Sequence, residues 1–127
     1  MLTSDAGVRL LVGCAGLMGA AGVGLAAIAA HAAQGSSLAS AAYILLFHAA
    51  AVLAGASLIG RSGLASLPLK LALLGWVIGS ALFASDITLR TFEGFPLFPM
   101  AAPTGGSTLI LAWLALAAAA LLGKRST

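Results

Sequence analysis

The sequence predicts an all-α membrane protein, an antiparallel bundle of four transmembrane helices. The chain has 127 residues, of which 61% are hydrophobic and only 7% charged, whereas soluble domains carry about 25% charged residues. Apolar residues are not alternated with polar ones, so a β-barrel is not expected. We expect one transmembrane domain over residues 1–127, with spans at about 9–32, 40–60, 68–90 and 105–123, each near the roughly 20 residues that cross a bilayer.

The first span has a continuous stripe of small residues. Its apolar run from Leu10 to Ala30 exceeds the apolar region of a signal peptide, so we interpret it as a true span. At 100° per residue, one face carries Gly13, Gly16, Ala20, Gly24 and Ala27. Small residues allow helices to approach closely. The pattern therefore predicts that this face packs against a neighbouring helix, with His31 continuing it at the outer end as a hydrated or capping histidine.

The second span contains a histidine about 12 Å from its start, close to the bilayer midplane. His48 shares a face with Ala41, Val52 and Gly55, which predicts a buried position. We interpret it as a neutral imidazole bonded to a backbone carbonyl or a hydroxyl of another helix. Tyr43 lies on a different face, as expected of an aromatic residue at the outer interface.

The third span combines a packing motif with an acidic residue. Gly75 and Gly79 form a small-xxx-small pair, and Leu82, Asp86 and Arg90 extend the same face. An ionisable residue inside a span is costly and is a functional candidate by default.

Two structural roles are open for Asp86. It can pair with Arg90, four residues later on the same helix. It can also accept hydrogen bonds from the free amides at Gly105 and Gly106, where the dipole of the fourth helix favours an anion.

The connection between the third and fourth spans is rich in aromatic residues and prolines. The stretch "TFEGFPLFPMAAPTGG" places phenylalanines between prolines that forbid a long helix. We expect it to lie in the lipid interface or to fold over the bundle. Thr104 or Ser107 is expected to cap the fourth helix, and Trp76 and Trp113 are expected to face lipid or to pack.

The distribution of cations predicts the orientation of the chain. Arg9, Arg61, Lys70, Lys124 and Arg125 flank the two termini and the second connection. A single cation, Arg90, lies near the other two connections. By the positive-inside rule, both termini and the second connection should be cytoplasmic. The net charge of +3 is thus a topology signal with some attraction to anionic lipid, and we expect no nucleic-acid partner.

The candidate polar cluster of the chain is small, and it comprises His31, Tyr43, His48, Asp86, Arg90, Gly105 and Gly106. A haem held by the two histidines is disfavoured because they differ in depth by roughly half a bilayer. A metal site from His31, Asp86 and Glu93 has suitable ligand types but no supporting local spacing. No nucleophile motif, phosphate-binding loop or cysteine pair is present. We therefore expect no enzyme, no metal and no cofactor.

Several segments together resemble a known family. These are "AAIAAH" at residues 26–31, "AYILLFHA" at 42–49, "LFASDITL" at 82–89, and "APTGG" at 102–106 followed by a tryptophan. Over about residues 9–122 the chain resembles the small bacterial inner-membrane proteins of the domain of unknown function 423 family, whose eukaryotic relatives are called transmembrane protein 256-like. Alanines stand here at two family glycines before His31. The resemblance implies a four-helix membrane bundle and supplies no established activity.

The sequence favours a structural or accessory membrane protein that belongs to an oligomer or a larger membrane complex. The expected partners are the lipid bilayer and other membrane subunits, or further copies of the chain, in the bacterial inner membrane. The alternative is a component of a proton or small-solute transporter or channel, in which His48 and Asp86 line an outward-facing polar pocket.

Overall fold

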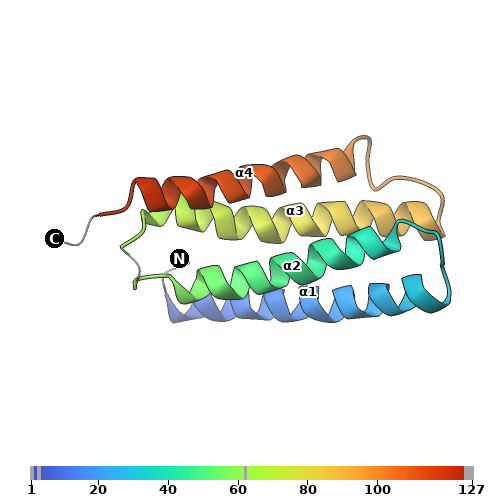
Figure 1. Cartoon of the computed structure of the whole chain (residues 1–127), viewed down its shortest axis with the longest axis horizontal. Coiled ribbons are helices and arrows are strands. Elements are labelled where there is room, and N and C mark those ends of the chain that lie inside the picture. Colours follow the sequence, from blue (N-terminus) through green and yellow to red (C-terminus); the bar gives the residue numbers. More distant parts are fainter. Residues whose placement is uncertain (1, 3, 62, 125–127) are drawn as a thin grey trace.

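The computed structural model describes residues 2, 4–61 and 63–124 and contains four antiparallel α-helices (Figure 1). They are α1 (Asp5–His31), α2 (Leu38–Ser57), α3 (Ser66–Phe92) and α4 (Ala101–Leu121). All four are long and apolar enough to cross a membrane. The described residues form no strand. The all-α class and the four helices predicted from the sequence are confirmed, and the chain is a multi-pass membrane protein.

The helices lie side by side in chain order (Figure 1). α1 packs along α2, α2 along α3, and α3 along α4, whereas α1 touches α3 only slightly and is not a neighbour of α4. The molecule is therefore two helical hairpins joined along α2 and α3. This order follows from short connections, which keep consecutive helices adjacent.

Glycines lie at the closest approach in each of the three helix interfaces. A Cβ on Gly22 of α1 would lie 2.7 Å from the Leu46 side chain of α2. A Cβ on Gly55 of α2 would lie 2.8 Å from Leu73 of α3. Between α3 and α4 a Cβ on Gly79 would meet Gly105 O at 2.9 Å. Small residues at these points are what allow the backbones to pack closely in lipid.

The main core gathers side chains from all four helices, with Trp76 at its centre as the largest fully buried side chain. A smaller cluster contains Met18, Leu45 and Ala84. It lies where α1, α2 and α3 come together.

The predicted packing face of the first span is wrong. Gly13, Gly16, Ala20, Gly24, Ala27 and His31 are all exposed, and a Cβ on Gly13, Gly16 or Gly24 would meet no neighbouring atom within 4 Å. α1 packs instead through Leu11, Ala15, Met18 and Gly22. The small-residue pattern identifies a face that is suited to packing. However, α1 packs along α2 only, and the face with Leu11, Ala15, Met18 and Gly22 makes that contact, so the small-residue face stays exposed.

The fourth helix starts earlier than predicted. It begins at Ala101, so Pro103 lies in its first turn, where a missing N–H costs no helical hydrogen bond. The N-cap is Met100, in the left-handed conformation with φ 67°, and it makes no side-chain capping bond. The expectation that Thr104 or Ser107 caps the helix is therefore wrong, since both residues already lie inside it.

The two ends of the molecule differ in charge. The connection end carries residues 32–37 and 93–100, and the terminal end carries the start of α1, the end of α4 and residues 58–61 and 63–65 (Figure 1). Four of the five cations used to predict the orientation lie at the terminal end, namely Arg9, Arg61, Lys70 and Lys124. The fifth, Arg125, lies outside the described residues. Arg90 is at the connection end.

Candidate functional site

His48 is a buried histidine whose two ring nitrogens are both bonded. Its side chain is 6% exposed in the middle of α2. Nδ1 lies 2.8 Å from Ile44 O, and Trp113 Nε1 donates to Nε2 over 3.2 Å. A carbonyl only accepts and an indole N–H only donates. The bonds therefore assign a neutral ring with its proton on Nδ1, and the carbonyl belongs to its own helix, not to another as predicted.

Two tryptophans complete an aromatic cluster around this histidine. The rings of His48 and Trp113 have centroids 6.1 Å apart, and those of Trp113 and Trp76 are 4.6 Å apart, distances typical of tilted aromatic pairs. The cluster joins α2, α4 and α3. It therefore links α2 and α4, which are not neighbours in the helix order. The sequence gives no sign that Trp113 is the partner of His48, because the two residues are 65 positions apart and local spacing does not relate them.

Asp86 is fully buried near the end of α3 and binds in two directions. Arg90 Nε donates to Oδ2 over 2.7 Å, which confirms the predicted pair four residues apart. The Leu97 amide of the α3–α4 connection donates to Oδ1 over 2.8 Å. The predicted amides of Gly105 and Gly106 are not among these donors, because α4 begins earlier and both glycines lie inside the helix.

The two bonds of Asp86 anchor the α3–α4 connection to α3. This connection exposes large apolar side chains at the connection end of the molecule, among them Phe95, Leu97, Phe98 and Met100. Aromatic and apolar residues at this height are suited to the membrane interface. The buried carboxylate thus holds an apolar surface segment in place.

The remaining residues of the predicted polar cluster do not come together around one site. His31 is exposed at the end of α1, and its side chain makes no hydrogen bond or ion pair with the described residues. Tyr43 is exposed, and its ring is tilted against that of Phe47, with centroids 6.4 Å apart. Gly105 packs against α3, and a Cβ on Gly106 would meet nothing within 4 Å.

Two further polar groups are buried in α3. Trp76 Nε1 and Ser80 Oγ have no hydrogen-bond partner among the described residues. Ser80 follows the glycine of the packing motif directly and was not singled out from the sequence. In lipid a Ser hydroxyl commonly bonds across helices.

The site offers hydrogen bonding more than reactivity. Within residues 2, 4–61 and 63–124, no three His, Cys, Asp or Glu side chains are grouped so as to hold a metal ion. Both nitrogens of His48 and both oxygens of Asp86 are already bonded inside the chain. These two residues hold helices and a connection together at two depths in the membrane.

Comparison with known proteins agrees with the resemblance noted above. The family described as "Protein of unknown function (DUF423)" matches residues 25–106, well over half of the chain. The matched segment runs from the last turns of α1 to the start of α4 and includes His48 and Asp86 but not Trp113. No curated protein and no solved structure matches the chain. The chain therefore belongs to the DUF423 family of proteins of unknown function.

Proposed function

We propose that this chain is a structural or accessory subunit of the bacterial inner membrane, with both termini in the cytoplasm and no catalytic activity of its own. It works within an oligomer or a larger membrane complex. Three features support the proposal: the chain has very little mass outside its helices, its two buried ionisable side chains are bonded internally, and one helix presents an unused packing face.

The observation that carries this proposal is the open face of α1. An exposed stripe of small residues, the open face, runs along more than three turns of α1. It consists of Gly13, Gly16, Ala20, Gly24 and Ala27. Small residues in a membrane helix favour close helix–helix contact. A helix of another chain fits such a face better than disordered lipid tails, because it gains close backbone packing there.

The test is the state of assembly of the protein extracted gently from its own membrane, measured by native mass spectrometry. Wild-type protein is expected to carry a discrete additional protein mass, either another subunit or a second copy. The double variant Gly13→Leu, Ala20→Leu should lower the association constant about tenfold, which corresponds to about 1.4 kcal/mol.

The matched control is Ala117→Leu, an exposed alanine on α4, which should leave assembly unchanged. A wild-type protein that is a bare single chain in these extracts contradicts the proposal.

The alternative function is a proton or small-solute pathway that uses His48 and Asp86. Ionisable residues inside spans often mark such pathways. The internal hydrogen bonds of both residues count against it, since a proton relay needs a free acceptor. In vesicles containing the protein, His48→Ala or Asp86→Asn should abolish flux while assembly survives. Equal flux in wild type and both variants rejects this function.

A further inference from the structure

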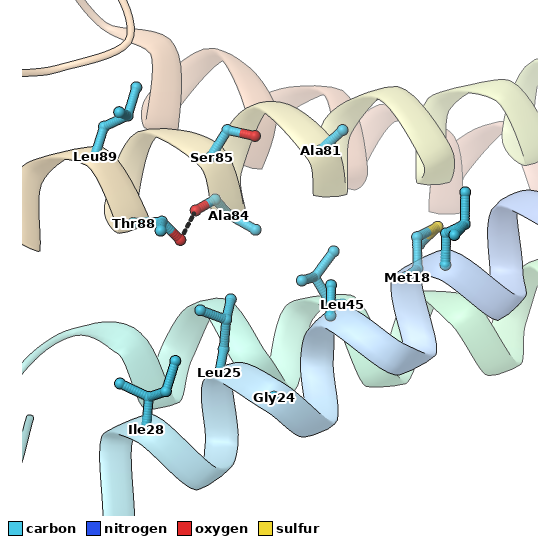
Figure 2. Close-up of a pocket in the computed structure, with 12 residues that line it drawn as sticks. Met18, Gly24, Leu25, Ile28, Leu45, Ala81, Ala84, Ser85, Thr88 and Leu89 are labelled. Carbon is cyan, nitrogen blue, oxygen red and sulfur yellow. Dashed lines mark hydrogen bonds between the residues drawn. The ribbon is translucent and has the colours of Figure 1, made fainter. Parts of the chain in front are cut away.

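An apolar groove runs between α1 and α3 in the half of the molecule near the connection end. Its volume is about 650 Å³. Figure 2 shows Leu25 and Ile28 of α1 facing Ala84 and Thr88 of α3 across this space. Leu45 of α2 closes its deep side. The groove exists because α1 touches α3 only slightly, so the space beside α2 stays open toward the bilayer.

The groove spans one leaflet in depth. The midpoint of α1 is Met18 and that of α3 is residue 79, halfway along each helix. At about 1.5 Å per residue, the lining runs from this level to Ile28 and Leu89, both about 15 Å farther toward the connection end. Half of a hydrocarbon core of about 30 Å has the same length.

The lining of the groove is apolar at both ends and includes two hydroxyl residues near the connection end, beside Ile28 and Leu89. Near the midpoint the side chains are apolar, as at Leu17, Met18 and Ala81. The hydroxyl groups of the lining, on Ser85 and Thr88, lie about 9 Å and 14 Å from the midpoint of α3, toward the connection end. The Thr88 hydroxyl donates to Ala84 O over 2.7 Å. The lining carries no charged side chain.

We propose that this groove binds one acyl chain of a phospholipid from the leaflet at the connection end. The chain lies along the groove with its methyl end near Met18, and the ester groups lie at the level of Thr88 and Leu89, about 15 Å from the midpoint of α3. The length, the depth and the apolar lining of the groove match the acyl chain of a lipid in one leaflet. A partner helix is a poorer fit, because it would run the full span, whereas the groove covers only half.

The test uses phosphatidylglycerol carrying a diazirine in the middle of its acyl chain, in vesicles with the full-length protein. After illumination, labelled positions are mapped by peptide mass spectrometry. Labelling at groove residues such as Leu17, Ala21 and Leu25 should exceed labelling at Ile110 and Leu114 of α4 about tenfold, or about 1.4 kcal/mol. These α4 side chains are also exposed and report ordinary contact with bulk lipid.

A pair of variants tests the site itself. Ala81→Trp is expected to fill the groove near the midpoint of α3. Ala50→Trp places the same side chain at an exposed position of α2 outside the groove. Native mass spectrometry should show one retained phospholipid per chain in wild type and Ala50→Trp, and none in Ala81→Trp.

Three outcomes overturn the proposal. The first is equal labelling of groove and α4 residues, which means bulk lipid only. The second is equal lipid retention in both variants. The third is a crosslink from groove residues to a second copy, which makes the occupant a helix. The labelling pattern of wild type decides the matter even if a tryptophan variant fails to fold. Gly24 belongs to both the groove and the open face of α1, but Gly13 and Ala20 do not line the groove. The double variant Gly13→Leu, Ala20→Leu therefore tests the proposed assembly separately from the lipid site.

Discussion

At the residue scale, the buried ionisable side chains among the described residues, His48 and Asp86, are bonded in a way that suits a membrane interior. A polar group without a partner is costly in hydrocarbon, so such groups pair within the protein. His48 bonds to its own helix and to Trp113 of α4. Asp86 bonds to Arg90 and to the backbone of the following connection. These bonds give each residue a structural task that its position in the sequence alone does not reveal.

Replacement by phenylalanine is expected to have different effects at the two neighbouring tryptophans, Trp113 and Trp76. Trp113→Phe removes the N–H that bonds to His48 and should cost about 0.6–1.7 kcal/mol, the range of interhelical hydrogen bonds in membranes. Trp76→Phe removes a buried N–H that has no partner among the described residues, so it loses ring packing but no hydrogen bond. Unfolding in mixed detergent, followed with and without His48→Ala, measures the coupling. Coupling to His48 that is as large for Trp76→Phe as for Trp113→Phe would contradict this assignment.

A second residue-scale prediction concerns the anchor of the α3–α4 connection. Asp86→Ala removes the acceptors of both Arg90 and the Leu97 amide, so the connection should detach from α3. Asp86→Asn keeps one oxygen for the Leu97 amide, but it replaces the other with an NH2 group, so the charge and the bond from Arg90 are both lost. Limited proteolysis should cleave residues 93–100 fastest in Asp86→Ala and at an intermediate rate in Asp86→Asn. Equal cleavage in wild type and Asp86→Ala would show that the carboxylate does not hold this segment.

At the scale of the element, close packing depends on which face of each helix meets its neighbour. Gly79 of α3 and Gly105 of α4 bring two backbones together. The open face of α1 is likewise made of glycines and alanines, but it has no neighbouring helix among the residues that the structure describes. Composition therefore identifies faces able to pack closely, and the arrangement of helices selects which of them are used inside the chain.

Two neighbouring glycines provide a matched test of the α3–α4 contact. A Cβ on Gly105 would lie 2.7 Å from Gly79 O and from Phe83 N, backbone atoms that cannot move aside singly. Gly105→Ala should therefore force the helices apart and cost about 1–3 kcal/mol, as overpacked interiors do. Gly106→Ala meets no atom within 4 Å and should be neutral or slightly stabilising. Thermal unfolding of the two variants makes the comparison, and equal stability would argue against a close contact here.

At the scale of the whole molecule, the helix order α1–α2–α3–α4 explains both unused surfaces. Because α1 is not a neighbour of α4 and barely touches α3, one side of α1 remains open and the groove forms between α1 and α3. Both features are candidates for partners from outside the chain, one for a helix and the other for a lipid.

The orientation of the molecule in the membrane is a separate prediction at this scale. In a Cys14→Ser background, which removes the one cysteine of the chain, Ser37→Cys and Glu93→Cys lie at the connection end. Ala6→Cys and Ser66→Cys lie at the terminal end. A membrane-impermeant maleimide should label the first pair in intact spheroplasts and the second pair only after lysis. The opposite pattern reverses the predicted orientation.

The sequence by itself determined the class of the protein, the number of helices and which end carries most cations. These properties depend on apolar composition and on the length needed to cross a bilayer, both of which are local and additive along the chain. It also gave the pairing of Asp86 with Arg90 as one of two alternatives, since residues four apart on a helix are neighbours whatever the rest of the chain does.

Only the tertiary structure decided which faces are buried and which distant groups meet. The bond of Trp113 to His48, the Leu97 amide on Asp86, the early start of α4 and the open face of α1 all depend on the relative rotation and order of helices. Helices in lipid associate through packing and a few hydrogen bonds, without a hydrophobic drive that buries every apolar face. Apolar periodicity therefore carries little information about which side faces inward, and contacts across helices settle it.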